Sequence, residues 1–248
     1  MFIYKNLRKI YWKLRGLIEK VLGTRLWEKR WANRNALSND DWGNNKHLLQ
    51  KNGWIFKYWD SQDHSHRKFL LENIEKFYPF SSILEIGSNC GPNLVLIAKK
   101  FPKIKIVGID INKKAIDIGK NLMVREGITN VELYQGKADE LNKFTGKSFD
   151  IIFTDATLIY IGPDKIYQVL KEIARLARKA IVFLEQYVEG EEEYKALGIY
   201  QFGLWKRNYK NMLKKFFAEE QIKIIKLPND AWDEKGWKES GILVEVRL

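Results

Sequence analysis

The sequence predicts an α/β fold: a seven-stranded, mostly parallel sheet whose last strand is antiparallel, with helices on both faces and a helical cap before it. Short apolar runs alternate with segments of helical period, which is typical of parallel strands joined by helices. Two later runs follow each other without a helix between them, so the last strand is expected to be antiparallel. The strands are expected at 83–86, 104–110, 131–134, 149–155, 179–185, 222–227 and 242–246.

Length and composition indicate a globular protein of one large domain with an added N-terminal piece. The 248 residues suffice for a substantial core, and no apolar run approaches the ~20 residues of a membrane span. The single Cys90 excludes an internal disulfide and fits a reducing compartment, and no Cys/His cluster typical of structural zinc occurs. With no cleavable signal pattern at the N-terminus, the sequence predicts a cytoplasmic protein with no bound metal.

The N-terminus is strongly basic. Residues 1–34 carry ten Lys or Arg and two Glu, a net of +8 out of the chain's +12. Apolar residues recur every three or four positions along residues 1–24, which predicts an amphipathic helix with a basic face. Such a helix can lie at an anionic membrane surface, which would make the protein peripheral at the inner membrane face. It can also pack on the domain or on a second copy, and nucleic acid is a weaker candidate for its basic face.

Residues 25–64 form a Trp-rich segment that is expected to fold over the core as a helical cap, because it holds too many large apolar side chains to stay solvated. A helix is predicted to follow, capped by Asp63 or Ser65. His64 lies beside this start and is a candidate general base, with capping or a surface contact as the alternative interpretation. His66 has the same alternatives, and two residues apart on a helix the pair is poorly placed to share a metal.

The sequence I-L-E-I-G-S-N-C-G-P-N at 83–93 predicts a buried strand, a tight turn and the start of a helix. Gly87 and Gly91 let the backbone approach a ligand, with the first helical N–H groups pointing at it. The dinucleotide spacing G-x-G-x-x-G is absent, and Glu85 puts negative charge where a pyrophosphate would gain nothing. An acid here suits a ligand with a cationic end, although an ordinary α/β turn would give the same pattern.

The next two strands lead to further acids. The second strand ends at Asp110, 23 residues after Gly87, where a carboxylate can accept both hydroxyl protons of a ribose. Ile111 would then flank the base of that nucleoside. After the third strand, Ala138 and Asp139 form a small-then-acidic pair that can meet the exocyclic amine of an adenine. The alternative for Asp139 is a helix N-cap.

The fourth and fifth strands end in polar side chains, and ligands of open α/β sheets collect at such ends. The candidates there are Thr154, Asp155, Tyr160, Glu185, Gln186 and Tyr187. Four groups are candidates for a general base: Asp155, Glu185, His64 and His66. Asp155 has the best position of the four.

The glycine turn, Asp110, Asp139 and the apolar strand 149–155 together resemble the class I S-adenosylmethionine (SAM) methyltransferases, over residues 65–248. The resemblance implies a Rossmann-like fold and SAM as cofactor. It places Gly87, Asn89 and Gly91 at the methionine part of SAM, Asp110 at the ribose, and Ala138 and Asp139 at the adenine. The predicted cofactor set also includes Glu85, Ser88, Asn93, Ile111 and Thr154. Asn89 departs from the family pattern, which usually has a glycine there.

A closer resemblance rests on I-L-E-I-G-S-N-C-G-P-N-L, F-T-D-A-T-L-I-Y-I-G-P-D, V-F-L-E-Q-Y and L-W-K-R-N-Y. These segments look like methylases found beside pseudaminic-acid and other surface-sugar pathways. The resemblance implies a sugar or sugar-linked acceptor. The side chains it places near that acceptor are Asp155, Tyr160, Glu185, Gln186, Arg207 and Tyr209. Tyr187, at the end of the fifth strand, is a further substrate-binding candidate.

The sequence therefore predicts an enzyme of the EC 2.1.1 class that uses SAM to methylate an oxygen of a sugar, glycan-linked or other small acceptor. Transfer needs alignment of the acceptor with the methyl group, and a hydroxyl acceptor must also lose its proton. The alternatives are an RNA methyltransferase that uses the basic N-terminal arm, and a non-catalytic binding module of the same fold. The fourth strand is not followed by an N-P-P-Y-type tetrapeptide, which weakens a nucleobase target.

Overall fold

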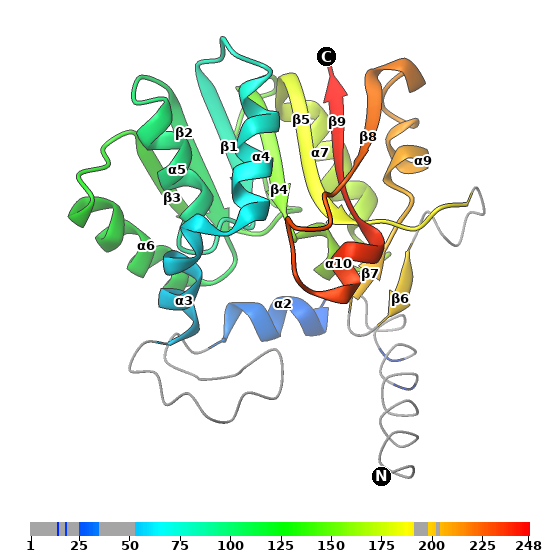
Figure 1. Ribbon diagram of the computed structural model, residues 1–248, viewed down its shortest axis with the longest axis horizontal. Helices are drawn as coiled ribbons and strands as arrows, with labels where there is room; N and C mark the ends of the chain where they lie inside the picture. The colour runs from blue at the N-terminus through cyan, green and yellow to red at the C-terminus, as the bar shows by residue number, and fades with distance from the viewer. Residues whose placement is uncertain (1–13, 15–17, 19–24, 35–52, 191–197, 202–203) are drawn as a thin grey trace.

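The structure, a computed structural model, describes residues 14, 18, 25–34, 53–190, 198–201 and 204–248. Seven strands form one sheet in the order β3-β2-β1-β4-β5-β9-β8, in which β9 runs antiparallel to both of its neighbours. The strands are β1 Ser82–Ile86, β2 Lys105–Asp110, β3 Val131–Gln135, β4 Phe149–Asp155, β5 Ala177–Gln186, β8 Ile222–Lys226 and β9 Gly241–Arg247. The predicted fold class is confirmed (Figure 1).

The helices lie on both faces of this sheet and at the end where its parallel strands finish (Figure 1). They are α2 Arg25–Ala32, α3 Trp54–Asp60, α4 Ser65–Glu75, α5 Pro92–Lys100, α6 Lys113–Arg125, α7 Ile166–Leu176, α9 Tyr209–Leu213 and α10 Lys235–Ser240, with short 3₁₀ turns η1 Ser61–Asp63, η2 Leu158–Tyr160 and η3 Glu219–Gln221. A small separate hairpin is formed by β6 Ile199–Gln201 and β7 Leu204–Lys206.

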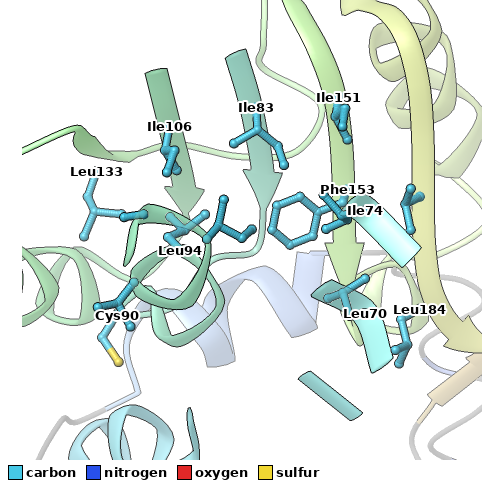
Figure 2. Packing of buried hydrophobic residues seen from close by; sticks show 14 of the residues in the cluster. Leu70, Ile74, Ile83, Cys90, Leu94, Ile106, Leu133, Ile151, Phe153 and Leu184 are labelled. Carbon is cyan, nitrogen blue, oxygen red and sulfur yellow. The ribbon is translucent and has the colours of Figure 1, made fainter. Parts of the chain in front are cut away.

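Side chains of successive strand residues enter two separate cores, because they alternate between the faces of the sheet. Ile83 faces the core that contains α4, α5 and α6, whereas Leu84 faces the core that contains α7 and α9. Figure 2 shows the first core, where Ile106 and Phe153 from the strands meet Leu94 from α5. The central strands β1 and β4 are buried on both faces along almost their whole length, as expected for a parallel sheet.

Several element boundaries differ from the sequence-based expectation. The α10 helix lies between β8 and β9, which we expected to be joined without a helix. The α4 helix is capped by His64, whose ring accepts from the backbone N–H of His66, rather than by Asp63 or Ser65. The α7 helix begins at Ile166 after a turn that starts at Gly162. Apolar periodicity predicts that a helix exists but does not fix its first turn, which depends on capping contacts.

The cap and the N-terminal segment lie before the sheet in the chain. Figure 1 shows α2 crossing the end of the sheet at which the parallel strands finish. The predicted N-terminal helix, residues 1–24, lies outside the described residues except for Leu14 and Ile18, which are helical and exposed. Among the residues that the structure describes, no helix is both long and apolar enough to cross a membrane.

Candidate active site

A pocket lies between the carboxyl ends of β1, β2 and β4 and the helices α2 and α3. It brings together residues from the glycine turn, from the three following strand ends and from the cap. The lining residues used below are Trp27, Glu28, Trp31, Trp54, Tyr58, Arg67, Glu85, Gly87, Ser88, Asn89, Asn93, Asp110, Ile111, Ala138, Asp139, Asp155, Ala156, Thr157, Tyr160 and Lys165. Nine of the eleven predicted cofactor residues are among them; Thr154 and Gly91 are not.

The turn after β1 needs a left-handed backbone at three positions. Gly87 has φ +81°, and a Cβ there would lie 2.1 Å from Oγ1 of Thr157. Gly91 has φ +89° and precedes Pro92 at the first position of α5. Asn89, where the resembled family usually has glycine, has φ +52° and accepts from the N–H of Cys90 at 2.7 Å. Asn tolerates this conformation better than most residues, so the departure from glycine is compatible with the same turn.

Glu85 is buried at the end of β1 and faces the pocket. Its Oε1 accepts from Nδ2 of Asn93 at 2.7 Å, while Oε2 has no hydrogen-bond partner among the described residues. Burial raises the pKa of Glu85 to about 8, although the hydrogen bond from Asn93 opposes the shift. A buried acid with one free oxygen at the rim of a pocket suits a cationic group of a ligand.

Asp155, at the end of β4, lies beside the same asparagine. Its Oδ2 accepts from Nδ2 of Asn93 at 3.0 Å and from Nη1 of Arg67 at 3.2 Å, and it lies 3.1 Å from Nε2 of His66. Burial would raise the pKa of the Asp155 carboxyl, but the charges of His66 and Arg67 outweigh burial, so the pKa falls below its usual range. Oδ1 of Asp155 has no hydrogen-bond partner within the part of the chain that the structure describes.

Asp110 lines the pocket and also holds the glycine turn after β1 by hydrogen bonds. Its Oδ2 accepts from the backbone N–H of Asn89 and its Oδ1 from that of Asn112, both at 2.8 Å. Asn112 caps α6 and also donates from Nδ2 to the carbonyl of Trp31 at 2.8 Å, which ties α2 to the end of β2. Each Asp110 oxygen keeps a second lone pair, so the carboxylate can still accept from a ribose hydroxyl.

Asp139 does not cap a helix, which was the alternative for it. Its Oδ2 lies 2.9 Å from Nζ of Lys165, which also contacts Oε1 of Glu28 on α2. The sequence analysis did not single out Lys165, because a lysine just before a helix is common and only the fold brings it to Asp139.

Glu185 lies outside the pocket lining and is occupied by other contacts. Its oxygens accept from Thr154 Oγ1 and from the backbone N–H groups of Thr157, Leu158 and Ile159, at 2.8 to 3.2 Å. Burial raises its pKa to about 7 against these hydrogen bonds. This geometry does not support a catalytic role for Glu185. It indicates that Glu185 holds the turn that follows β4.

The same turn is held from its other side by Arg207. The buried guanidinium donates from Nη1 to the carbonyl of Leu158 at 2.9 Å and from Nη2 to that of Ile161. Ala156 within the turn has φ +52°, a strained conformation for a residue other than glycine. The turn places Tyr160 in the pocket, where its ring lies 5.3 Å from Trp27 and 5.0 Å from Trp31.

Of the predicted acceptor residues, the structure therefore brings Asp155 and Tyr160 to the pocket. Gln186, Tyr187, Arg207 and Tyr209 do not line it, and neither does His64. Arg67 and the Trp residues of α2 and α3 line the pocket but were not predicted as site residues. The high density of Trp residues in the segment that precedes the first strand was the one signal in the sequence that could have identified these Trp residues as part of the site.

We expect Glu185→Ala to lower the free energy of unfolding by about 3 kcal/mol or more, because it leaves buried N–H donors without an acceptor. Glu185→Gln keeps one carbonyl oxygen and should cost less. Chemical denaturation measures both, with the exposed Glu220→Ala as the matched control. If Glu185→Ala unfolds at the same denaturant concentration as this control, Glu185 does not hold the turn.

Comparisons with known proteins agree with this geometry. A family model described as a methyltransferase domain matches residues 83–180, from β1 into β5. Residues 83–180 are a methyltransferase domain. The predictions of a methyltransferase and of SAM as its cofactor are confirmed for this domain.

Individual proteins are similar to the chain at lower identity. An uncharacterised protein of Rickettsia prowazekii is 33% identical over 96 residues, which is 38% of each chain. A ribosomal RNA small subunit methyltransferase G of Ureaplasma parvum is 22% identical over 201 residues, 74% of this chain and 92% of that protein. A SAM-dependent methyltransferase from Aquifex aeolicus shares the fold with a TM-score of 0.56 and 15% identity, over 77% of this chain and 95% of its own.

The pocket of the methyltransferase domain fits SAM by its own chemistry. Three buried polar atoms around it have no hydrogen-bond partner among the described residues: Glu85 Oε2, Ser88 Oγ and Asp155 Oδ1. The acids at the end of β1 and β4 suit the ammonium and sulfonium charges, and the Arg67 guanidinium suits a carboxylate. Unpartnered buried polar atoms are costly unless a ligand completes them.

Proposed function

We propose that this protein is a SAM-dependent methyltransferase that methylates an oxygen of a sugar, sugar-linked or other small acceptor. The observation that carries the proposal is the wall of the pocket, where five aromatic side chains line the same cavity as the Asp155 carboxylate. They are Trp27, Trp31, Trp54, Tyr58 and Tyr160. Aromatic faces pack on the apolar faces of sugar rings, and a carboxylate accepts from their hydroxyls. Four of the five belong to the cap helices α2 and α3, and an aromatic wall of this kind favours a small acceptor.

Four charged side chains would hold the cofactor. Arg67 would bind the methionine carboxylate, Glu85 the ammonium, Asp110 the ribose hydroxyls and Asp139 the adenine amine. SAM supplies a methyl group on a positively charged sulfur when it is bound. The remaining task of the protein is to align the acceptor oxygen with that methyl group and to accept the proton that the oxygen loses.

Asp155 is the group that we assign to accept this proton, through its free Oδ1. An acceptor oxygen that took the methyl group, as the sulfur–carbon bond broke and S-adenosylhomocysteine left, would carry a positive charge and a strongly acidic proton. A carboxylate with a lowered pKa is therefore a sufficient base, and it stays ionised at neutral pH. Arg67 and Asn93 both contact Oδ2, and Oδ1 keeps no hydrogen-bond partner among the described residues.

His66 and His64 extend this arrangement away from the pocket. His66 Nδ1 lies 2.6 Å from Nδ1 of His64, which also accepts from the backbone N–H of His66. The His66 ring thus joins Asp155, at its Nε2, to His64, at its Nδ1. Burial and the charges of His66 and Arg67 lower the pKa of His64. Trp232 stacks on His66 at 4.0 Å and fixes its plane.

RNA is the second candidate acceptor. The net charge of +12 favours binding to a polyanion, and the similarity to a ribosomal RNA methyltransferase over 74% of the chain points the same way. Such binding would weaken steeply with salt, whereas binding of a neutral sugar would not. Contact of the basic residues 1–24 with an anionic membrane stays a proposal, since they lie almost wholly outside the described residues.

Transfer of labelled methyl from SAM tests the proposal. The protein is incubated with nucleotide-activated sugars and lipid-linked or free glycans, and separately with ribosomal RNA and ribosomal subunits. We expect label in the sugar fraction, and a loss of about 10²-fold or more in Asp155→Asn, in which the base is neutral. Label in RNA alone would replace the sugar with RNA as acceptor. SAM binding without transfer to any acceptor would indicate a binding module.

A further inference from the structure

Lys165 stands between the cap and the predicted adenine end of the pocket. Its ammonium lies 2.9 Å from Oδ2 of Asp139, on the connection between β3 and β4, and contacts Oε1 of Glu28 on α2. The side chains of these three residues are only 17 to 25% exposed. Ion pairs shielded to this degree are screened less by water and salt than surface pairs. Lys165 thus joins Glu28 on α2 to Asp139 on the connection between β3 and β4.

The α2 helix covers the part of the pocket that is predicted to hold the nucleoside. Trp27, Glu28 and Trp31 line the same cavity as Asp110 and Asp139. Trp27 is only 2% exposed and its ring packs against Tyr160, so α2 packs on the domain. Opening of this contact would therefore speed the release of a ligand bound under α2.

We propose that Lys165 couples recognition of the adenine amine at Asp139 to closure of α2 over the cofactor. The proposal rests on the proposed function, because it takes SAM as the ligand. The Asp139 carboxylate that Lys165 positions can accept from the amine donor of adenine, and it repels the carbonyl oxygen of a 6-oxopurine. The same ammonium holds Glu28 and with it α2.

Removal of the lysine changes both ends of this link at once. Without Lys165, the carboxylates of Glu28 and Asp139 face the pocket without the cation that joins them, and their repulsion favours an open α2. Lys137 does not replace it, because its Nζ lies 3.8 Å from Glu28 and is paired with Glu140 at 2.9 Å. Coupling of this kind is reciprocal: a bound adenine strengthens closure, and closure strengthens adenine binding.

Dissociation of S-adenosylhomocysteine, followed by Trp fluorescence in a stopped-flow instrument, tests the closure. We expect Lys165→Met to release this ligand about tenfold faster than the wild type or more. Glu28→Gln should speed release as well, and the double variant should be no faster than Lys165→Met, because both changes break one link. Lys113→Met, on the outer side of α6, is the control and should leave the rate unchanged.

Competition with S-inosylhomocysteine, which carries an oxygen in place of the adenine amine, tests the recognition. The wild type should prefer S-adenosylhomocysteine by on the order of tenfold or more, and Asp139→Asn should lose this preference. Unchanged release from Lys165→Met, or additive effects of Lys165→Met and Glu28→Gln, would overturn the coupling. A wild type that binds neither ligand would instead overturn the proposed function.

Discussion

Asp110→Ala is expected to weaken SAM binding by about a hundredfold or more. The change removes a charged acceptor for two ribose hydroxyls, and hydrogen bonds to charged groups contribute about 1.5–3 kcal/mol each. It also frees the N–H groups of Asn89 and Asn112, which Asp110 now holds at 2.8 Å. Loss of these contacts loosens both the glycine turn and the start of α6.

Isothermal titration with SAM measures this effect. Asp117→Ala is the matched control, because Asp117 is an acid on the next helix that pairs at the surface with Lys113. Thermal denaturation of the apo variant separates loss of the ligand contact from loss of the fold. An affinity of Asp110→Ala equal to that of the control would show that the ribose does not lie at the end of β2.

Glu85→Gln should stabilise the apo protein at alkaline pH while it weakens SAM binding. Burial raises the folded-state pKa of Glu85 to about 8, from an unperturbed value of 4.5. The folded state therefore binds more protons than the unfolded state between these values, so this group lowers stability as pH rises from 4.5 to 8. The glutamine has no such titration.

We therefore expect the melting temperature of Glu85→Gln, relative to the wild type, to increase through this pH range and to level off above it. For a chain of this size, 1 kcal/mol corresponds to about 2–4 °C, so the difference at pH 8.5 should reach several degrees. Comparison of the two proteins also cancels the titration of Glu185, which has a raised pKa in the same range. A difference that does not change with pH would show that Glu85 does not titrate in this window.

Binding of SAM should also be linked to the ionisation of Glu85, but in the opposite direction: folding favours the protonated carboxyl, whereas SAM binding favours the carboxylate. The cationic end of SAM favours the ionised form of Glu85, so binding near pH 7 releases a proton from the wild type. Calorimetry in two buffers of different ionisation enthalpy counts that proton. Glu85→Gln should release fewer protons, and subtraction removes the contribution of SAM's own amino group, which titrates near pH 8.

More of the residues predicted for the cofactor than of those predicted for the acceptor line the pocket. Glu85, Gly87, Asp110 and Asp139 were found from strand ends and glycine spacing, because such positions are local to each strand-turn-helix unit. Glu185 has the same type of position, yet its carboxylate turns to backbone N–H groups of a neighbouring turn. Whether a strand-end acid faces the ligand or supports a loop depends on which loop lies beside it.

By itself, the sequence determined the seven-stranded sheet, its antiparallel last strand and the glycine turn over which SAM is expected to lie. These follow from hydrophobic period and turn residues, which act over a few positions of chain. Only the tertiary structure placed Arg67 beside Asp155, 88 positions away, and Lys165 beside Glu28, 137 positions away. Contacts over such separations depend on how helices pack and how the cap closes, and no local pattern in the sequence records them.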